Sequence, residues 1–365
     1  MWVLCTAGWA ISSVKSMWSE VIPMGGNSRG PIENSLMRRL RIVFMAGMAS
    51  LFLGLAVFCV GDKKAAEICL EEIGSVGTLD DDLLFQWVGV AVDREQKLYV
   101  TDAMDYRLKK IDIQGRLLNS VGGRGRGPGQ FLAPRNLVWF DGRLYVSDQY
   151  VPGLQVFDEE LRYRRRIMFQ QPIVDFEVIS SDRVVISSLT PNKKPALYFL
   201  DGSGEPKGSL VYNDQKVPFM QESVSFCMDR RGDFYLAFSF QNRIEKWTGD
   251  GIFLWRRHPL KKVKPVRKRI GGWEVPTEVV LKDIALDSRD RIFVLGGGYS
   301  RNRSRDIYVY DSEGKPCGNL LLPEPSHCLY IDSKNNLYAR ANEGITLKKY
   351  RIIETSRQIG GRRGS

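Results

Sequence analysis

Histidine and cysteine are scarce in this chain of 365 residues, which holds two histidines and six cysteines. The histidines, His258 and His327, lie far apart in the sequence, so without help from carboxylates they do not supply the ligands of a zinc centre. The cysteines form no C-x-x-C pair, which argues against a cysteine-based zinc site and gives no disulfide framework. The later cysteines are therefore expected to be small apolar fillers in strands: Cys69, Cys227, Cys317 and Cys328.

Familiar catalytic motifs are missing as well. The glycine-rich run 122–129 lacks the Lys-Ser/Thr pair and the following helix of a phosphate-binding loop, so we expect a flexible link there. Ser181 and Ser225 have no evident histidine partner, which leaves a serine nucleophile unsupported. The oxygen-bearing side chains near the starts of predicted strands could equally cap those strands, and no spacing singles them out: Asn136, Asp175, Glu177 and Asp283. The sequence thus identifies no catalytic residue and no metal ligand.

What the chain does have is one pattern of about 40–50 residues that occurs six times. In the first unit, residues 89–122, an apolar run ends in Asp and is followed by a polar turn, an aromatic-rich strand, a loop and a third strand. An Asp-x-x-Gly type of turn then leads to a fourth strand, with glycine supplying the positive φ that such turns need. Alternation with a period of two marks the runs as strands. Four strands per repeat indicate the blades of a β-propeller.

Six inner strands can be assigned, at residues 89–93, 136–140, 174–179, 224–229, 283–287 and 327–332. The sixth unit stops one strand short, whereas residues 66–73 form a strand-like run with no partner of their own. That run is expected to close the ring as the outer strand of the last blade, because an open ring would leave unpaired edges. The predicted fold is all-β, a six-bladed β-propeller over residues 62–353 that is closed by an N-terminal latch strand.

The repeats resemble the NHL family. The resemblance rests on YVTDAMDYRLKKID (99–112), on FSFQNRIEKW (238–247) and on the linker SVGGRGRGPGQFLAPRNL (120–137), and it covers about residues 66–353. The third unit, SSLTPNKKPALYFLD (187–201), lacks the family's Asp and Arg, and the sixth unit is also degenerate. The resemblance implies a six-bladed propeller of an exported bacterial protein.

The N-terminal part carries an export pattern. Arg38, Arg39 and Arg41 precede an unbroken apolar run, 42–60, close to the ~20 residues that span a bilayer. Residues 37–61 are therefore expected to be a signal peptide or membrane anchor that places the propeller on the extracytoplasmic, periplasmic side. Cys59 leaves lipidation open. Residues 1–36 are interpreted as a disordered extension or an over-extended start, and residues 354–365 as a disordered basic tail.

The formal net charge of +11 favours anionic partners. Links between blades and loops between second and third strands share one face of a propeller, which we call the basic loop face. Its candidate ligand-binding residues are Tyr106, Arg107, Arg135, Tyr150, Asn242, Arg243, Trp273 and Arg301. Its candidate patch for an anionic partner is Arg256, Arg257, Lys261, Lys262, Lys264, Arg267, Lys268 and Arg269. A solvated basic surface, with Arg107 and Arg243 paired to blade carboxylates, is the alternative interpretation.

We therefore expect an exported, membrane-tethered binding or scaffold module that recognises a protein or an anionic polymer or lipid surface, with no cofactor and no enzymatic activity. The alternative is a calcium-dependent hydrolase or lactonase with carboxylate ligands at the propeller axis. His327, just before the sixth inner strand, could also face that axis. A third hypothesis is a sensor domain that signals through residues 42–60. Nucleic acid is the less expected partner of an exported protein.

Overall fold

The computed structural model describes residues 67–355 apart from 79, 190–194, 213–222, 262, 265, 271–272 and 342–343. These residues belong to one unit that spans residues 65–365. The expected N-terminal extension, the signal or anchor segment 37–61 and the tail from 356 onward lie outside the described residues. No helix in the described part is long and apolar enough to cross a membrane.

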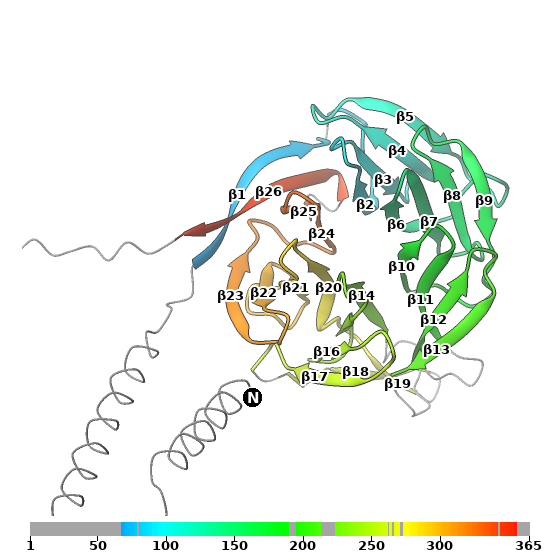
Figure 1. The fold of residues 1–365 in the computed structure, drawn as a ribbon. Helices are drawn as coiled ribbons and strands as arrows, with labels where there is room; N and C mark the ends of the chain where they lie inside the picture. Colours follow the sequence, from blue (N-terminus) through cyan, green and yellow to red (C-terminus); the bar gives the residue numbers. More distant parts are fainter. Residues whose placement is uncertain are drawn as a thin grey trace, which may run out of the picture. The chain divides into compact units, whose positions relative to one another are not determined.

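Six four-stranded antiparallel sheets surround a central axis as the blades of a propeller (Figure 1). The first blade is β2 (Trp87–Val92), β3 (Leu98–Asp102), β4 (Arg107–Ile111) and β5 (Leu117–Gly122). The second is β6 (Pro134–Phe140), β7 (Arg143–Asp148), β8 (Leu154–Asp158) and β9 (Tyr163–Ile167). The third is β10 (Asp175–Ser180), β11 (Arg183–Leu189), β12 (Pro195–Asp201) and β13 (Pro206–Val211).

The fourth blade is β14 (Val224–Met228), β15 (Phe234–Phe238), β16 (Ile244–Trp247) and β17 (Phe253–Arg257). The fifth is β20 (Leu281–Leu286), β21 (Ile292–Gly296), β22 (Asp306–Tyr310) and β23 (Pro316–Leu321). The sixth is β24 (Leu329–Ile331), β25 (Asn336–Ala341), β26 (Thr346–Thr355) and β1 (Glu67–Val76). These bounds agree with the predicted all-β class, the blade number and each of the six predicted inner strands.

The sixth blade joins the two ends of the described chain. β1 pairs antiparallel with β26 from Glu67 opposite Thr355 to Val76 opposite Leu347, with one irregularity after Glu72. Ion pairs accompany the ladder, with Lys348 Nζ 2.7 Å from Glu72 Oε1. Of the run predicted as a latch, 66–73, residues 67–73 lie in β1, and the pairing covers an edge of β26 that would otherwise be open.

Aspartates that follow or end strands organise the tight turns within the blades. In seven of them one carboxylate oxygen accepts hydrogen bonds from the backbone N–H groups two and four residues later: Asp112, Asp158, Asp201, Asp229, Asp287, Asp311 and Asp332. Asp112 accepts from Gln114 and Arg116 at 2.9 and 2.8 Å, and Asp332 accepts from Lys334 and Asn336 at 2.9 and 2.8 Å. The repeated Asp of the sequence pattern is therefore a turn cap.

The hydrophobic core consists of six clusters, one between each pair of neighbouring blades. The cluster between the sixth and first blades contains Trp87, Val90, Tyr338 and Leu347. Trp87 is fully buried and donates its indole N–H to the carbonyl oxygen of Thr346 at 3.0 Å. Because each cluster is shared, no blade buries its apolar faces alone, which is the physical reason for the repeat.

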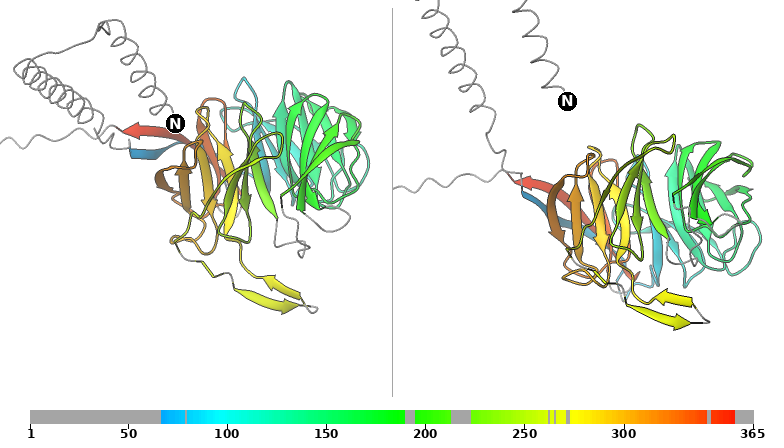
Figure 2. Two further views of the ribbon diagram at one scale, coloured as in Figure 1. Left: turned by 60° about the horizontal axis from the view of Figure 1, so that its bottom comes forward. Right: turned by 90° about the horizontal axis from the view of Figure 1, so that it is seen from below.

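One element was not predicted. Within the expected basic link, β18 (Arg267–Ile270) and β19 (Trp273–Pro276) form a two-stranded hairpin between the fourth and fifth blades. Figure 2 shows it extending away from the ring of blades. Its base is held by the Val266 N–H, which donates to the Tyr299 hydroxyl at 2.6 Å.

Candidate binding site at the propeller axis

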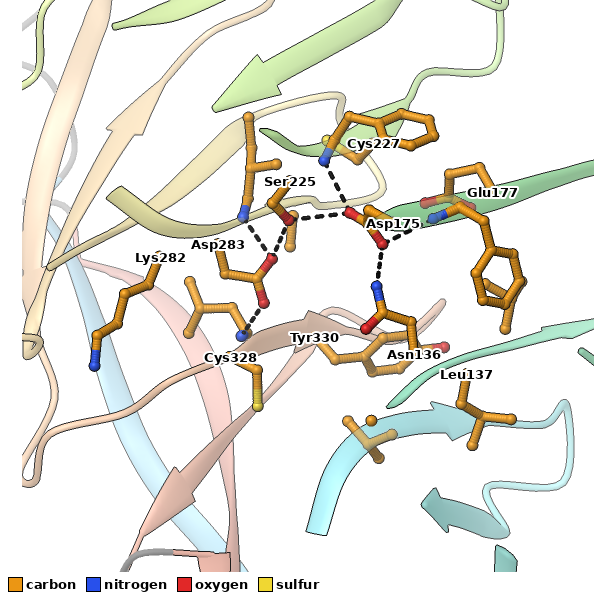
Figure 3. A pocket seen from close by; sticks show the side chains of 18 of the residues that line it. Asn136, Leu137, Asp175, Glu177, Ser225, Cys227, Lys282, Asp283, Cys328 and Tyr330 are labelled. Atoms are coloured by element: carbon orange, nitrogen blue, oxygen red, sulfur yellow. Dashed lines mark hydrogen bonds between the residues drawn. The ribbon is translucent and has the colours of Figure 1, made fainter. Parts of the chain in front are cut away.

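A cavity of about 660 Å³ lies on the axis and is lined by the inner strand of every blade (Figure 3). Among the lining residues, β2, β6, β10, β14 and β20 each have one at a matching position of the blade, and in the sixth blade this position is held by Cys328, just before β24. For example, Gly89 pairs with Thr101, Asp175 with Ser187 and Asp283 with Leu295. We call this set the axial ring: Gly89, Asn136, Asp175, Ser225, Asp283 and Cys328. Polar side chains at four consecutive positions make one side of the ring chemically distinct.

Asp175 connects three blades. Its Oδ1 accepts from the Asn136 amide of the second blade and from its own strand's Phe176 N–H at 2.9 Å. Its Oδ2 accepts from the Phe226 N–H of the fourth blade at 3.0 Å, and the Ser225 hydroxyl lies 3.1 Å from the same oxygen. Asp175 is therefore a bridge between inner strands that have no ladder of their own.

Asp283 continues the network into the last blade. Its Oδ2 accepts from the Leu329 N–H at 2.8 Å, and its Oδ1 accepts from the Ile284 N–H at 2.9 Å. The Ser225 hydroxyl oxygen lies 2.6 Å from the same Oδ1. Figure 3 shows the resulting chain from Asn136 through Asp175 and Ser225 to Asp283.

This hydrogen-bonded network holds a proton between its two aspartates, Asp175 and Asp283. Desolvation, together with the charge of Asp283, raises the pKa of Asp175 to about 7, and desolvation raises the pKa of Asp283 to about 6. Ser225 has one hydroxyl proton and lies within hydrogen-bond distance of both carboxylates. A proton on Asp175 lets it donate to Ser225, which donates in turn to Asp283.

Glu177 lies one level along β10 from Asp175. Its neighbours at this level are mostly apolar: Val138, Cys227, Ala285 and Tyr330. Desolvation and the nearby Asp175 raise the pKa of Glu177 to about 8, an effect that the Val178 N–H offsets in part. Among the described residues no cation forms an ion pair with it, so the carboxyl is neutral below that pH.

The opposite side of the network carries positive groups. Lys282 precedes Asp283 on β20, and Figure 3 shows its side chain directed away from the Asp283–Ser225 pair. Its ammonium nitrogen lies 3.1 Å from the carbonyl oxygen of Ser326 and 2.8 Å from Nδ1 of His327. Arg340, which extends from β25, lines the same cavity. Lys282, His327 and Arg340 thus line one cavity, and among the described residues no carboxylate forms an ion pair with Lys282.

Burial and mutual repulsion shift the pKa values of these groups. Desolvation lowers the pKa of Lys282 to about 8. Cys328 opposes this shift in part, and the charge of Arg340 adds a smaller lowering effect. Desolvation, Lys282 and Arg340 lower the pKa of His327 to about 4. The imidazole is therefore neutral at pH 7, and its Nδ1 accepts from Lys282. An anion in the cavity would relieve this repulsion.

Calcium does not fit the oxygen groups as they are arranged. Calcium takes about six to eight oxygen ligands, and a carboxylate has about four lone-pair positions. Three N–H donors already surround Asp175 and two surround Asp283, and the one Ser225 hydroxyl lies within hydrogen-bond distance of both carboxylates. Within the described ranges, no group of three or more His, Cys, Asp or Glu side chains is placed to hold a metal ion. We therefore derive no step that depends on a metal.

Several predicted residues of the basic loop face support the blades. Arg107 Nε lies 3.6 Å from Asp105, and Arg243 Nε lies 3.5 Å from the buried Glu245. Arg243 also stacks on Phe238, with 3.6 Å from its Cζ to the ring centre. Asn242 exchanges two hydrogen bonds with the backbone of Leu260. These contacts match the alternative in which the repeat arginines pair with blade carboxylates.

The other predicted loop-face residues do not converge on one site. Arg135 contacts Gln149 and lines the axial cavity. The Tyr106 ring lies 5.9 Å from the Arg124 guanidinium. Tyr150 is 59% exposed and Arg301 is also exposed. Trp273 begins β19, but its side chain lies outside the described part.

The basic patch divides in two. Arg256 pairs with Glu245 at 2.7 Å, and Arg257 donates to the Gly314 carbonyl oxygen at 2.7 Å, so both hold blades together. Lys262 lies outside the described residues. The remaining members are exposed in the link and on β18: Lys261, Lys264, Arg267, Lys268 and Arg269.

Lys282 and Arg340 were missed by the sequence analysis, and His327 was only noted as able to face the axis. The positions of these residues along the propeller axis can be compared by aligning the strands according to the register of each blade. In the sixth blade Leu329 pairs with Ala339, so Cys328 and Arg340 lie next to that pair. The alternation along β20 places Lys282 and Asp283 on different sides. The alternation of side chains along this strand was thus the sequence signal from which the position of Lys282 could have been predicted.

No protein-family model and no curated protein matches this chain. Solved structures resemble it in fold. The WD40 β-propeller domain of Doa1 is 12% identical, with a TM-score of 0.51 over 75% of this chain and 79% of that one. The calcium-binding protein regucalcin from Agrobacterium tumefaciens is 13% identical, with a TM-score of 0.52 over 79% of this chain and 97% of that one.

Virginiamycin B lyase from Staphylococcus aureus is 10% identical, with a TM-score of 0.51 over 79% of this chain and 100% of that one. At such low identity these likenesses show the fold and carry no activity with them. The NHL-repeat type and the export of the protein remain predictions from the sequence, and the chain is a six-bladed β-propeller.

Proposed function

We propose that this chain is a binding protein whose axial cavity takes a small anionic molecule. The observation that carries the proposal is the placement of Lys282, His327 and Arg340 on one wall of a cavity of about 660 Å³. A cavity of this size with a few convergent polar groups is the usual form of a small-molecule site. Perturbed titratable groups also gather at functional sites.

An anion is favoured over other ligands by the hydrogen bonds of Lys282. An ammonium group has three N–H donors, and the acceptors found for it are the Ser326 carbonyl oxygen and His327 Nδ1. One donor is left for a ligand. The lowered pKa of Lys282 has the same implication, because a carboxylate or phosphate beside it would restore the usual charge balance.

The remaining polar groups of the axial ring would give selectivity. Asn136, Asp175, Ser225 and Asp283 face the same cavity and form a preorganised network. Such a network accepts hydrogen bonds from hydroxyl or amine groups of a ligand and excludes a second negative charge. The ligand we propose is therefore a small molecule with an acidic group at one end and hydrogen-bond donors at the other.

Export and tethering complete the proposal. The run 42–60, after three arginines, would hold the propeller at the extracytoplasmic side of a membrane. The ligand would then be a molecule of that compartment.

A second candidate is recognition of a protein or an anionic surface by the β18–β19 hairpin. It is favoured by the projection of the hairpin from the blades (Figure 2) and by its exposed Arg267, Lys268 and Arg269. The calcium-dependent hydrolase has weaker support. The neighbour regucalcin is described as calcium-binding, but the aspartates of the axial ring here are already surrounded by donors.

The test is calorimetric titration of the purified protein with citrate, pyruvate, lactate and inorganic phosphate at pH 7. Binding of at least one of them is expected, and Lys282→Met should weaken it by at least tenfold. Lys334→Met, an exposed lysine in the turn after β24, is the matched control and should bind as the wild type does. Equal affinity in Lys282→Met, or no heat with any probe, would remove the proposal.

A further inference from the structure

Lys282 is half-buried and differs from the three lysines that the blades bury fully, Lys109, Lys110 and Lys246. Lys109 lies 3.0 Å from Asp102 and 2.8 Å from Asp105, and Lys246 lies 3.1 Å from Asp233. Lys110 pairs with Glu160 at 2.7 Å. Each of these is held as an ammonium ion by a carboxylate. Among the described residues, no carboxylate forms an ion pair with Lys282, whose acceptors are a carbonyl oxygen and an imidazole nitrogen.

We propose that Lys282 is a nucleophilic amine that condenses with the carbonyl carbon of a small 2-oxo acid in the axial cavity and forms an imine. The proposal rests on the proposed function, since it names the class of anion that the cavity takes. It adds a covalent step at a stated atom, Nζ of Lys282. Three features carry it: the access of Nζ to the cavity, a neutral base beside it, and a positive group for the carboxylate.

A neutral amine is available because of the surroundings of Nζ. A lysine with the usual pKa of about 10.4 is roughly 0.4% neutral at pH 8. The lowered pKa of Lys282, about 8, makes a large share of it neutral at the same pH. Desolvated lysines beside other cations are activated nucleophiles for this reason.

The reaction balances without an oxidant, a reductant or a metal. The Nζ lone pair forms a bond to the carbonyl carbon while the C=O π electrons move to oxygen, which is protonated. The nitrogen loses two protons in turn, and the neutral Nδ1 of His327 at 2.8 Å is placed to receive each one and return it to the oxygen. The first protonates the alkoxide, and the second is added to the departing hydroxyl group. The hydroxyl group leaves as water when the C=N bond forms. One water is released for each imine.

The carboxylate beside the carbonyl explains why a 2-oxo acid is the substrate class. Arg340 lines the same cavity as Lys282 and His327, and we assign its guanidinium to the carboxylate on the adjacent carbon. Asp283 and Ser225 lie on the other side of the cavity, where hydroxyl groups of a longer 2-oxo acid would bond.

The experiment is reductive trapping. The full chain is incubated with pyruvate at pH 8 and sodium cyanoborohydride, digested, and mapped by mass spectrometry. One adduct of a reduced pyruvate imine is expected on Lys282, at least tenfold more abundant than on any other lysine. Lys282→Arg should lose that adduct, and Lys334→Arg should keep it. Because the wild-type peptide map locates the adduct by itself, the test does not depend on the variant being folded.

Lactate separates this inference from the proposed function. Lactate has the same carboxylate but no carbonyl, so it reports binding alone. If lactate binds and Lys282→Met weakens it, yet pyruvate is not trapped on Lys282, the imine is excluded and anion binding stands. If neither compound binds nor reacts, both fall. An adduct spread evenly over exposed lysines also overturns the imine.

Discussion

Among the residues at the axis, Glu177 is expected to have the strongest effect on the pH dependence of stability, because no cation of the described residues forms an ion pair with its carboxyl. Folding raises its pKa from its usual value near 4.5 to about 8. Below about pH 4.5 it is protonated in both folded and unfolded chains. Between these values only the folded chain holds the proton, so the stability that this difference contributes is lost as pH rises through about 8.

Glu177→Gln should therefore stabilise the protein at pH 9 and change little at pH 4.5. We expect a gain of about 1–3 kcal/mol in the free energy of unfolding at the higher pH. Urea denaturation at the two pH values measures it. Glu205→Gln, at an exposed turn position, is the control and should be neutral at both. An equal effect of Glu177→Gln at both pH values would contradict the desolvation that we assign to this carboxyl.

For single residues, the sequence predicted a structural role only where the interacting partners lie close together in the sequence. The Asp-x-x-Gly turn between third and fourth strands was predicted, and the bonds of its Asp112 are local, since the partners lie two and four residues away. The axial ring was not predicted as a site. Asp175 and Ser225 are 50 residues apart, and their contact depends on the placement of two separate blades.

The turns show most directly what the repeated Asp of the sequence pattern does, because its carboxylate accepts the hydrogen bonds that hold the turn. Asp332 is one of the turn aspartates that bind side chains as well as the backbone. Its Oδ2 lies 3.1 Å from the Tyr338 hydroxyl and 2.9 Å from the Asn336 amide, in addition to the two backbone N–H groups at Oδ1. Removal of this carboxylate leaves several buried donors without an acceptor.

Asp332→Ala is expected to lower the free energy of unfolding by about 2–4 kcal/mol. Chemical denaturation with a tryptophan fluorescence signal measures the loss. Asp250→Ala, at an exposed turn position, should cost less than about 0.5 kcal/mol. A loss of similar size in both variants would mean that the turn aspartates act by general charge and not by capping.

Strands were predictable where apolar alternation is present, even in the degenerate third blade, whose β11 and β12 form without the family's Asp and Arg. The β18–β19 hairpin was missed because RKRI has one apolar residue and gives no alternation. The hairpin is instead defined by its pairing, from Arg267 opposite Pro276 to Ile270 opposite Trp273. A composition dominated by charge conceals a strand that has no buried face.

Across the whole molecule, closure of the ring depends on two contacts between distant parts of the chain. β1 supplies the outer strand of the sixth blade, and Trp87 bonds to Thr346 across the cluster between the sixth and first blades. Both contacts join residues near the two ends of the described chain. The number of blades followed from counting repeats, whereas the cavity at the centre followed only from their arrangement.

A chain that starts at residue 77, and so lacks β1, should be less stable than a chain that starts at residue 62. We expect a lower thermal midpoint by several degrees and a tendency to associate through the uncovered edge of β26. Thermal denaturation and size-exclusion chromatography measure the two effects. Identical midpoints and elution for the two chains would show that β1 does not stabilise the ring.

The shared sixth blade also means that the fold is circular although the polypeptide is linear. Glu67 and Thr355 lie opposite each other in one ladder, so a short linker could join them and the chain could be cut elsewhere. The β18–β19 hairpin lies outside every blade and is a natural place for new ends. Such a permuted protein would keep the axial cavity while its termini moved to another part of the surface. The position at which a membrane anchor is attached is thus independent of the position at which a ligand is bound.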